Sequence, residues 1–374
     1  MKVCMITGTF PPIKCGVGDY SNILCNYLSQ VEEINLSVIT TKGIDKNNKY
    51  KIYDIVKNWD NSELKKIINK INDINPDIVH IQYPTLAYKK NIMINMLPYF
   101  LHKKYKIITT IHEYSDNSTL GKLRIWPNIF LSDAIIVVDK HYISDIKKVK
   151  FLRKRDFYYV NIGSNIPKSN IDKKDRDVIR NEILKNNCNR ILGYFGFINR
   201  TKGIESILYA INNLKEQNKL KTMFLIIGEL KKDDEYHNSI INLINKLDLN
   251  DYIYITGYLK SQDVGKYINA SDFMVLPFVN GLSSKNGSFL ASIQEGKHIV
   301  TTMRNGRKVF NGLNITYLNS YDDIQTLKNI IELNQQEGIK NYKVNSDFKF
   351  SWENIVEKHM EIYRNIIKNK RKLL

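Results

Sequence analysis

Short apolar runs alternate with helical patterns along almost the whole chain, and this alternation limits the fold more than any other feature. In the first half, strand patterns fall at residues 2–7, 36–41, 77–82, 106–112, 134–139 and 157–162. Helical patterns lie among them at 61–73, 89–104 and 140–148. Strands that are apolar throughout and separated by helices are typical of a parallel sheet covered on both faces. Residues 1–165 are therefore predicted to form one doubly wound domain.

A polar segment separates this series from a second one. Residues 166–177 contain Pro167 and lose apolar periodicity, which favours a hinge. Further strand patterns follow at 190–197, 223–228, 252–257, 273–278, 298–302 and 314–318. Residues 178–350 thus predict a second doubly wound domain, and residues 351–374 a terminal helix that crosses back to the N-terminal domain. The predicted fold class is α/β, with two Rossmann-like domains facing each other across a cleft.

Size and composition agree with a soluble two-domain protein. A chain of 374 residues exceeds one ordinary core. No apolar run reaches the ~18 to 20 residues of a membrane span, and the start MKVCMITGTFPP does not resemble a signal peptide. The four cysteines show no metal-ligand or disulfide spacing. A cytoplasmic protein is expected, and its formal net charge of +18 admits nucleic acid, an anionic membrane surface or an anionic substrate as partner.

The stretch GLSSKNGSFLASIQEGKHIVTT (residues 281–302) carries the strongest local signal. It follows the apolar run at 273–278 and offers glycines, serines and Lys285 before a helical pattern begins at Phe289. A polar loop at a helix N-terminus gathers unpaired backbone N–H groups, and the helix macrodipole adds roughly half a positive charge. The stretch is therefore predicted to bind a phosphate group.

A second loop of the same kind opens the C-terminal series, in GFINRTKGIESILYA. Arg200 and Lys202 lie on a turn just before the helix that Gly203 starts. Two cations beside a second helix N-terminus would hold a diphosphate. The alternative is that both are solvated loop residues, since exposed Lys and Arg are common.

Taken in order, these segments resemble the retaining family 4 glycosyltransferases, which have the GT-B fold. The resemblance rests on MITGTFPPIKCGVGDYSNILCNYL, DIVHIQYP, TTIHEY, NIGSNIP, GFINRTKGIESIL, ITGYL and ASDFMVLPFVNGLSSKNGSFLASIQEGKHIVTT. It spans nearly the whole chain. It implies transfer of a sugar from a nucleotide diphospho-sugar with retention of anomeric configuration, the nucleotide lying on the C-terminal domain and the acceptor on the N-terminal one.

The resemblance carries over to the C-terminal domain only in part. Lys202 matches the family's phosphate-binding lysine, but the family's arginine falls on Phe197, so Arg200 would reach the same oxygens from another position. The family's Glu-x7-Glu pair falls on Ser283 and Ala291. Glu295, one helical turn after Ala291, is the candidate replacement for the ribose-contacting glutamate, and a solvated helix end is the alternative.

A subgroup of the family has a Gly-x-Ser-x-Arg-Arg-Gly-Ser loop in place of that pair. Here Lys285 stands at the first arginine and Asn286 at the second. Gly287, Ser288 and Phe289 open the helix, and the backbone amides there would hold the β-phosphate.

The N-terminal candidates come from the resemblance and from residue chemistry together. Gly16 and Gly18 would let backbone approach the donor, with a structural tight turn as the alternative. Lys14 is the candidate contact for an anionic acceptor. His112 matches the family's histidine near the donor sugar, and Glu113 is a candidate base or sugar contact.

His80 is a second candidate on the acceptor side. It lies inside the apolar strand pattern DIVHIQ, so a hydrogen-bonded core histidine is the alternative.

No metal or other cofactor is expected, because protein cations and helix dipoles neutralise the leaving diphosphate in the family. The Asp-x-Asp at residues 175–177 lies in the predicted hinge and is taken as chance. No carboxylate in the matched motifs is placed for a double displacement, so the family's front-face route, in which the leaving phosphate deprotonates the acceptor, is the expected mechanism.

The expected role is bacterial surface-glycan assembly on a glycan or lipid-linked acceptor. The terminal KNKRKLL would rest on the anionic inner leaflet, or simply add solubilising charge. A sugar-nucleotide epimerase with the GT-B fold is one alternative. A nucleic-acid-binding or DNA-glycosylating protein is another, and it is less favoured because no helix-turn-helix, zinc-finger or RNA-binding signature appears.

Overall fold

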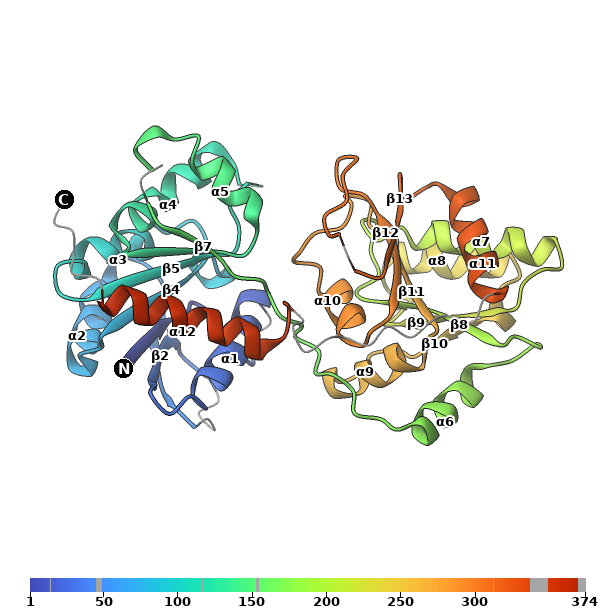
Figure 1. The fold of residues 1–374 in the computed structure, drawn as a ribbon, viewed down its shortest axis with the longest axis horizontal. Helices are drawn as coiled ribbons and strands as arrows, with labels where there is room; N and C mark the ends of the chain where they lie inside the picture. The colour runs from blue at the N-terminus through green and yellow to red at the C-terminus, as the bar shows by residue number, and fades with distance from the viewer. Residues whose placement is uncertain are drawn as a thin grey trace. The chain divides into compact units, whose positions relative to one another are not determined.

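The chain forms two compact units, drawn in Figure 1. The computed structural model describes residues 1–13, 15–44, 49–115, 117–152, 155–311, 313–336 and 349–368. The first unit comprises Met1–Gly163 and Lys349–Leu374, and the second comprises Ser164–Phe348. Within the described residues, no helix is long and apolar enough to cross a membrane.

The first unit is built on a seven-stranded parallel sheet in the order β3-β2-β1-β4-β5-β6-β7. Its strands are β1 (Lys2–Ile6), β2 (Asn35–Thr41), β3 (Lys51–Val56), β4 (Ile78–Tyr83), β5 (Lys106–Ile111), β6 (Ala134–Val137) and β7 (Phe157–Tyr159). The sequence pattern missed β3, because KIYDIV is only partly buried and carries a lysine and an aspartate at this edge of the sheet.

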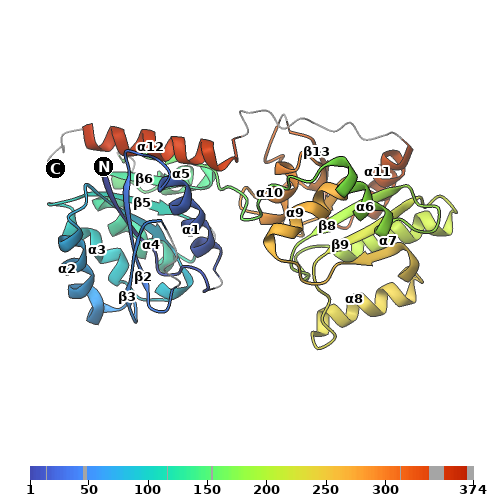
Figure 2. The same cartoon turned by 90° about the horizontal axis from the view of Figure 1, so that it is seen from below.

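Helices cover both faces of this sheet. They are α1 (Gly16–Leu28), α2 (Leu64–Ile74), α3 (Met93–Leu101), α4 (Thr119–Leu131), α5 (Lys140–Ile146) and α12 (Trp352–Lys368), with short 3-10 turns η1 (Asn61–Glu63), η2 (Leu86–Tyr88) and η3 (Lys150–Leu152). Alternate residues of β1 serve the two cores: Val3 and Met5 pack with α1 and α12, whereas Cys4 and Ile6 pack with α2 to α5. Figure 2 shows α12 lying along the face opposite α2 and α3.

The second unit has a six-stranded parallel sheet in the order β10-β9-β8-β11-β12-β13. Its strands are β8 (Arg190–Phe195), β9 (Thr222–Ile227), β10 (Ile253–Ile255), β11 (Phe273–Leu276), β12 (His298–Thr302) and β13 (Ile315–Leu318). Its helices are α6 (Lys173–Ile183), α7 (Ile204–Glu216), α8 (Glu235–Lys246), α9 (Ser261–Ala270), α10 (Gly287–Gln294) and α11 (Ile324–Gln336), with a 3-10 turn η4 (Asn250–Tyr252).

The prediction of two doubly wound α/β domains is confirmed, but two helices were missed. α4 escaped because Gly121 and Pro127 interrupt its pattern. α6 begins inside the predicted hinge 166–177, where Asp172 caps it by accepting a hydrogen bond from the Asp175 backbone N–H at 2.8 Å. The helix buries only Ile183, so it lacked the apolar stripe that marks a helix in sequence.

The strand order reverses once in each sheet. In the first sheet this occurs between β1 and β4, and in the second between β8 and β11. Ligands of open parallel sheets bind outside the carboxyl ends of the strands at this switch point. The loops that follow these four strands are therefore the places to look for function.

Candidate functional site

In the second unit, the loop after β11 delivers the N-terminus of α10 to the switch point. Asn286 stands at the helix N-cap, yet no side chain caps the helix. Instead, the Asn286 side-chain oxygen accepts a hydrogen bond from the Ser283 backbone N–H at 2.6 Å, and the Asn286 N–H donates to the Ser283 carbonyl at 3.1 Å. An asparagine side chain at the N-cap normally accepts from the first helical amides. Here the Asn286 side chain bonds to Ser283 instead and closes the preceding loop.

The start of α10 offers unsatisfied donors. The backbone N–H groups of Gly287 and Ser288 donate to no acceptor among the described residues. A Cβ added at Gly287 would meet nothing within 4 Å, so this backbone is open to a ligand. Beside it, the buried Ser284 hydroxyl has no hydrogen-bond partner in the described part of the chain. A bound anion would satisfy the two amides, because the open backbone at Gly287 leaves them room for a ligand.

Lys202 reaches the same switch point from the loop after β8. Its ammonium lies 5.0 Å from the centre of the Phe278 ring, and it forms no ion pair with any residue that the structure describes. Burial lowers the pKa of Lys202 from its usual value. Gly203 has a φ of +63°, and a Cβ there would lie 2.4 Å from the Pro277 carbonyl oxygen, so this loop packs directly on the one after β11. A half-buried cation without a carboxylate is suited to an anionic ligand.

Arg200 lies on the loop after β8, where its side chain contacts the start of α8. Its guanidinium stacks 5.2 Å from the centre of the Tyr236 ring, and the Tyr236 hydroxyl donates to Glu205 at 2.8 Å. His237 Nε2 donates to the Ile198 carbonyl at 2.9 Å and steadies the same loop. Arg200 is exposed, so the stacked position leaves its charge accessible.

One predicted donor contact, Glu295, is corrected by the structure. Glu295 lies at the carboxyl end of α10, about 12 Å along the axis from Gly287 at 1.5 Å per residue. Its oxygens accept from the Ser169 N–H at 2.6 Å, the Ser169 hydroxyl at 2.7 Å and the Asn269 amide at 3.1 Å. Glu295 therefore holds the segment before α6 and does not replace a ribose-contacting glutamate.

Phe289 contributes no side chain to the opening of α10. Its ring is fully buried and stacks on Phe310 with 5.2 Å between centres, so the side chain belongs to the core. Only its backbone lies at the opening of α10. Lys285, by contrast, is half-exposed in the loop, where its N–H donates to the Ser283 hydroxyl at 3.3 Å.

In the first unit, the two predicted glycines have different roles. α1 begins at Gly16, and a Cβ there would meet nothing within 4 Å, so the backbone is open. A Cβ at Gly18 would lie 3.0 Å from the Thr9 carbonyl oxygen and 2.9 Å from its hydroxyl. Gly18 thus serves close packing of α1 on the loop after β1, which is the tight-turn alternative. Lys14 lies outside the described residues.

His112 follows β5 directly, on the strand next to β4 at the switch point. Its Nε2 lies 2.8 Å from the Gln82 side-chain oxygen, and its ring meets the Tyr20 ring edge-on at 4.9 Å. The Tyr142 hydroxyl donates to the His112 carbonyl at 3.3 Å. The ring is therefore held from several sides at the carboxyl edge of the sheet. Glu113, next in sequence, is exposed.

His80 does not serve as an acceptor contact. It is completely buried in β4, with Nδ1 2.7 Å from the Tyr363 hydroxyl and Nε2 2.7 Å from the Thr110 hydroxyl. Burial lowers the pKa of His80 well below its usual value, and the neighbouring His359 and His112 add to the shift. The structure therefore shows the alternative given for this residue, a hydrogen-bonded core histidine.

Sequence reasoning missed two groups at these edges. The unpartnered Ser284 hydroxyl has no signal of its own in a serine-rich loop. Gln82 did have a sequence signal. Residues two apart in a strand share a face of the sheet, and Gln82 lies two residues after His80.

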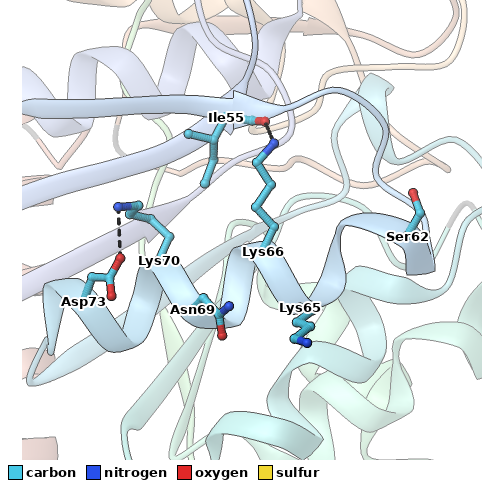
Figure 3. Close-up of a pocket in the computed structure, with 7 residues that line it drawn as sticks. All are labelled: Ile55, Ser62, Lys65, Lys66, Asn69, Lys70 and Asp73. Carbon is cyan, nitrogen blue, oxygen red and sulfur yellow. Dashed lines mark hydrogen bonds and ion pairs between the residues drawn. The ribbon is translucent and has the colours of Figure 1, made fainter.

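A hollow of about 420 Å³ lies elsewhere, along α2 and β3 (Figure 3). Its lysines serve their own neighbours: Lys66 donates to the Ile55 carbonyl at 2.6 Å, and Lys70 pairs with Asp73 at 3.1 Å. This hollow is not at the switch point. Among the residues that the structure describes, no group of three or more His, Cys, Asp or Glu side chains is arranged to hold a metal ion.

One family model and several known proteins are similar to this chain. Residues 175–284 match the family glycosyl transferases group 1. An uncharacterized glycosyltransferase of Methanocaldococcus jannaschii is 23% identical over 339 residues, which cover 86% of this chain and 77% of that protein.

Solved structures share the fold over nearly the entire length. A glycosyltransferase from Rickettsia africae superposes with a TM-score of 0.71 at 15% identity, covering 99% of both chains. The Anabaena protein HepE in complex with UDP-glucose gives 0.68 at 12% identity, covering 98% of this chain and 100% of the other. The UDP-GlcNAc 2-epimerase of Methanocaldococcus jannaschii gives 0.63 at 15% identity, with 98% and 100% covered. The chain thus has the GT-B fold, and residues 175–284 of its second unit are similar to the glycosyl transferases group 1 family.

Proposed function

We propose that the protein is a retaining glycosyltransferase that moves a hexosyl group from a nucleotide diphospho-sugar to a glycan or lipid-linked acceptor. The observation that carries the proposal is the open start of α10 beside Lys202. The Gly287 and Ser288 amides donate to no acceptor among the described residues, and the Lys202 ammonium forms no ion pair with any of them. These groups lie on the two loops of one switch point. A diphosphate has the charge and the acceptor oxygens that this set lacks.

In this proposal, stabilisation of the leaving diphosphate carries most of the catalysis. Lys202 and the α10 amides meet the negative charge that grows on the phosphate as the glycosidic bond breaks. Arg200 and Lys285 add positive charge on the same loops. The phosphate then deprotonates the acceptor hydroxyl from the same face as the leaving group, which accounts for retention without a protein nucleophile.

His112 and Glu113 are proposed to contact the sugar, on the basis of the family resemblance. The position of His112 after β5, beside the switch point of the first sheet, supports this role. Its imidazole is held by Gln82 and Tyr20, so it can direct a hydrogen bond without first being ordered.

The reaction is proposed to need no metal, because the protein supplies the positive charge at the diphosphate. Full activity should therefore persist in an excess of EDTA, measured as release of nucleoside diphosphate. A loss of activity that Mg²⁺ or Mn²⁺ restores would overturn metal independence while leaving the donor class intact.

A peripheral position on an anionic membrane is proposed for the lipid-linked acceptor. In support, α3 and α4 each carry a second apolar stripe that faces away from the core. The exposed large apolar side chains at helical spacing are Ile92, Met96, Tyr99 and Phe100 around α3, and Leu120, Leu123 and Phe130 on α4. An exposed apolar stripe of this kind marks an interaction surface.

These stripes form one surface, and its charge indicates the partner. α3 and α4 are joined by a buried hydrogen bond from Asn95 to Asn128 at 2.7 Å, and the exposed Phe151 of η3 packs on Trp126 at 5.0 Å. Residues 86–104, 117–131 and 147–155 carry four, two and six Lys or Arg and no Asp or Glu. Lys148 pairs with Asp145 at 2.7 Å, just outside these segments. Aromatic and apolar groups beside an excess of cations suit an anionic lipid headgroup layer.

A thermal-shift panel tests the core of the proposal. UDP, GDP, ADP and their sugars are added separately, and the matching nucleotide at 100 times its dissociation constant should stabilise the folded state by about 2.7 kcal/mol. The absence of a shift with every nucleotide would contradict the assignment.

The remaining alternative is a sugar-nucleotide epimerase, since one such enzyme shares the fold over almost the full length. An epimerase converts its nucleotide-sugar without an acceptor. Release of free nucleoside diphosphate only when acceptor is present would favour transfer, whereas isomerised nucleotide-sugar in its absence would favour the epimerase.

A further inference from the structure

A chain of buried polar side chains leads from His112 into the core of the first unit. His112 Nε2 lies 2.8 Å from the Gln82 oxygen, and the Gln82 amide nitrogen lies 3.2 Å from the Met5 sulfur and 3.3 Å from His80 Nε2. His80 Nδ1 continues the chain to the Tyr363 hydroxyl of α12 at 2.7 Å. All of these side chains are buried.

The chemistry of the partners favours one orientation of the Gln82 amide. The Met5 thioether has no hydrogen to donate, so only the NH₂ can form a hydrogen bond with it. The amide oxygen then faces His112 and can only accept. The His112 nitrogen at 2.8 Å must therefore carry the proton, because two acceptors at that distance would repel.

The same reasoning runs on to α12. Since the Gln82 NH₂ also points at His80 Nε2, that nitrogen accepts, the Thr110 hydroxyl at 2.7 Å donates to it as well, and the proton of the His80 ring lies on Nδ1. His80 Nδ1–H then donates to the Tyr363 hydroxyl. The orientation of the Gln82 amide thus determines the proton positions of both histidines, and the chain of hydrogen bonds ends at α12.

We propose that Gln82 is a positioning residue that holds His112 in the tautomer protonated at Nε2, leaving Nδ1 as the hydrogen-bond acceptor of the neutral ring. If the proposed function holds, the ring accepts a hydrogen bond from a sugar hydroxyl rather than donating one. Only this last step rests on the proposed function. A histidine that presents the wrong nitrogen loses this contact even when its ring is correctly placed. A side chain that serves packing alone would have no effect on the tautomer.

The test is a two-bond ¹⁵N–¹H correlation spectrum of the imidazoles in the full chain, which has seven histidines. Histidine is labelled with ¹⁵N, and the His112 signals are identified by their loss in His112→Asn. We expect Nε2 of His112 to appear protonated and Nδ1 to carry the lone pair. A ring protonated at Nδ1 in the unmodified protein would overturn the proposal without any further variant.

Two variants of Gln82 and one control make the cause specific. Gln82→Leu removes the acceptor and should shift His112 toward the other tautomer, whereas Gln82→Glu keeps an acceptor and should retain the Nε2 proton. The matched control is Asn95→Leu, which deletes a buried amide that pairs with Asn128 in the same unit. It should lower stability and leave the His112 signals unchanged.

An unchanged tautomer in folded Gln82→Leu would refute the role of Gln82. Should that variant fail to fold, the unmodified protein and Gln82→Glu still decide the question. The spectra need no nucleotide, so a protein that binds no nucleotide would overturn the proposed function and leave this inference standing.

Discussion

Lys202 is a cation without a counter-charge among the described residues. Its ammonium contacts an aromatic ring and lies partly buried, with no carboxylate among the described residues to balance it. Burial of a charged group is unfavourable, and the lowered pKa expresses that penalty. A bound phosphate would reverse it by supplying the missing counter-charge.

Lys202→Ala should therefore weaken binding of the matching nucleoside diphosphate. A charge-assisted hydrogen bond contributes about 1.5 to 3 kcal/mol, so the dissociation constant should rise about 10- to 100-fold. Isothermal titration calorimetry measures this directly. Lys185→Ala is the control, because Lys185 is exposed and precedes β8 at the opposite edge of the sheet. Equal affinity of both variants would remove Lys202 from the diphosphate site.

Lys297 presents the opposite case, a buried lysine that the structure does satisfy. Its ammonium donates to the carbonyls of Asn269 at 2.6 Å and Ser271 at 2.8 Å, and only 4% of the residue is exposed. Burial, aided by the nearby Arg176, lowers its pKa to about 7. The folded protein thus releases this proton at about pH 7, whereas an unfolded chain keeps it until about pH 10.4.

Between these values unfolding takes up a proton, so the contribution of Lys297 to stability must rise with pH. The free energy of unfolding of the unmodified protein should increase relative to Lys297→Met by at most about 1.4 kcal/mol per pH unit above pH 7. Urea denaturation at pH 7 and pH 9 compares the two. Parallel curves would show that Lys297 keeps an ordinary pKa.

At the scale of elements, the loop before α10 is organised to leave a helix end open. Asn286 is well suited to cap a helix, but its side chain turns back to Ser283. The Gly287 and Ser288 amides donate to no acceptor among the described residues, and the loop before them is held by Asn286, the residue that does not cap them. Binding would then depend on the shape of the loop as much as on its charge.

Asn286→Ala should separate these two functions. Because no cap is lost, the thermal stability of the protein should change little, while the loosened loop should lower nucleoside diphosphate affinity about tenfold, or about 1.4 kcal/mol. Differential scanning fluorimetry with and without nucleotide measures both quantities. A large fall in stability with unchanged affinity would show that Asn286 supports the helix and not the site.

At the scale of the whole molecule, the end of the chain completes the first unit. α12 packs Trp352 against Tyr20 and Tyr27 at 5.3 and 5.9 Å, and a Cβ at Gly163 would lie 2.6 Å from the Trp352 ring. Tyr363 then reaches His80 inside the sheet. The segment that sequence placed last is therefore part of the core on which His112 depends.

Part of the positive charge behind the net value of +18 lies in and around α3, α4 and η3 of the first unit. If the surface of α3, α4 and η3 docks on anionic lipid, the protein should float with vesicles that contain phosphatidylserine and not with neutral ones. Replacing Tyr99 and Phe100 by Ser should reduce recovery, since each exposed ring contributes roughly 2 kcal/mol when buried.

Leu333→Ser is the control for this experiment, because Leu333 is 56% exposed on α11 in the second unit. It should float as well as the unmodified protein. Equal recovery with anionic and neutral vesicles would contradict a membrane surface altogether.

Particular residues show how far sequence reasoning reached. Sequence reasoning placed Lys202 and the opening of α10 on loops that follow apolar strands, and the structure has them after β8 and β11 at the switch point; their binding of a phosphate stays a prediction. Glu295 was misplaced, because helical spacing says which residues share a face but not that Ser169 and Asn269 occupy it. The sequence left two predictions for His80, a core residue or an acceptor contact. The hydrogen bonds of its ring with Thr110 and Tyr363 place it in the core.

The sequence by itself determined the two doubly wound sheets and the polar loops at their carboxyl ends, because strand and helix periodicity is a local property of the chain. Only the tertiary structure decided which donors stay unsatisfied, since Asn286, Ser284 and Lys202 are equally able to pair with neighbours in other folds. It also decided the setting of His112, because Gln82, His80 and Tyr363 are brought together from three separate parts of the chain. Pairing of buried polar groups is a property of packing, and packing is not local.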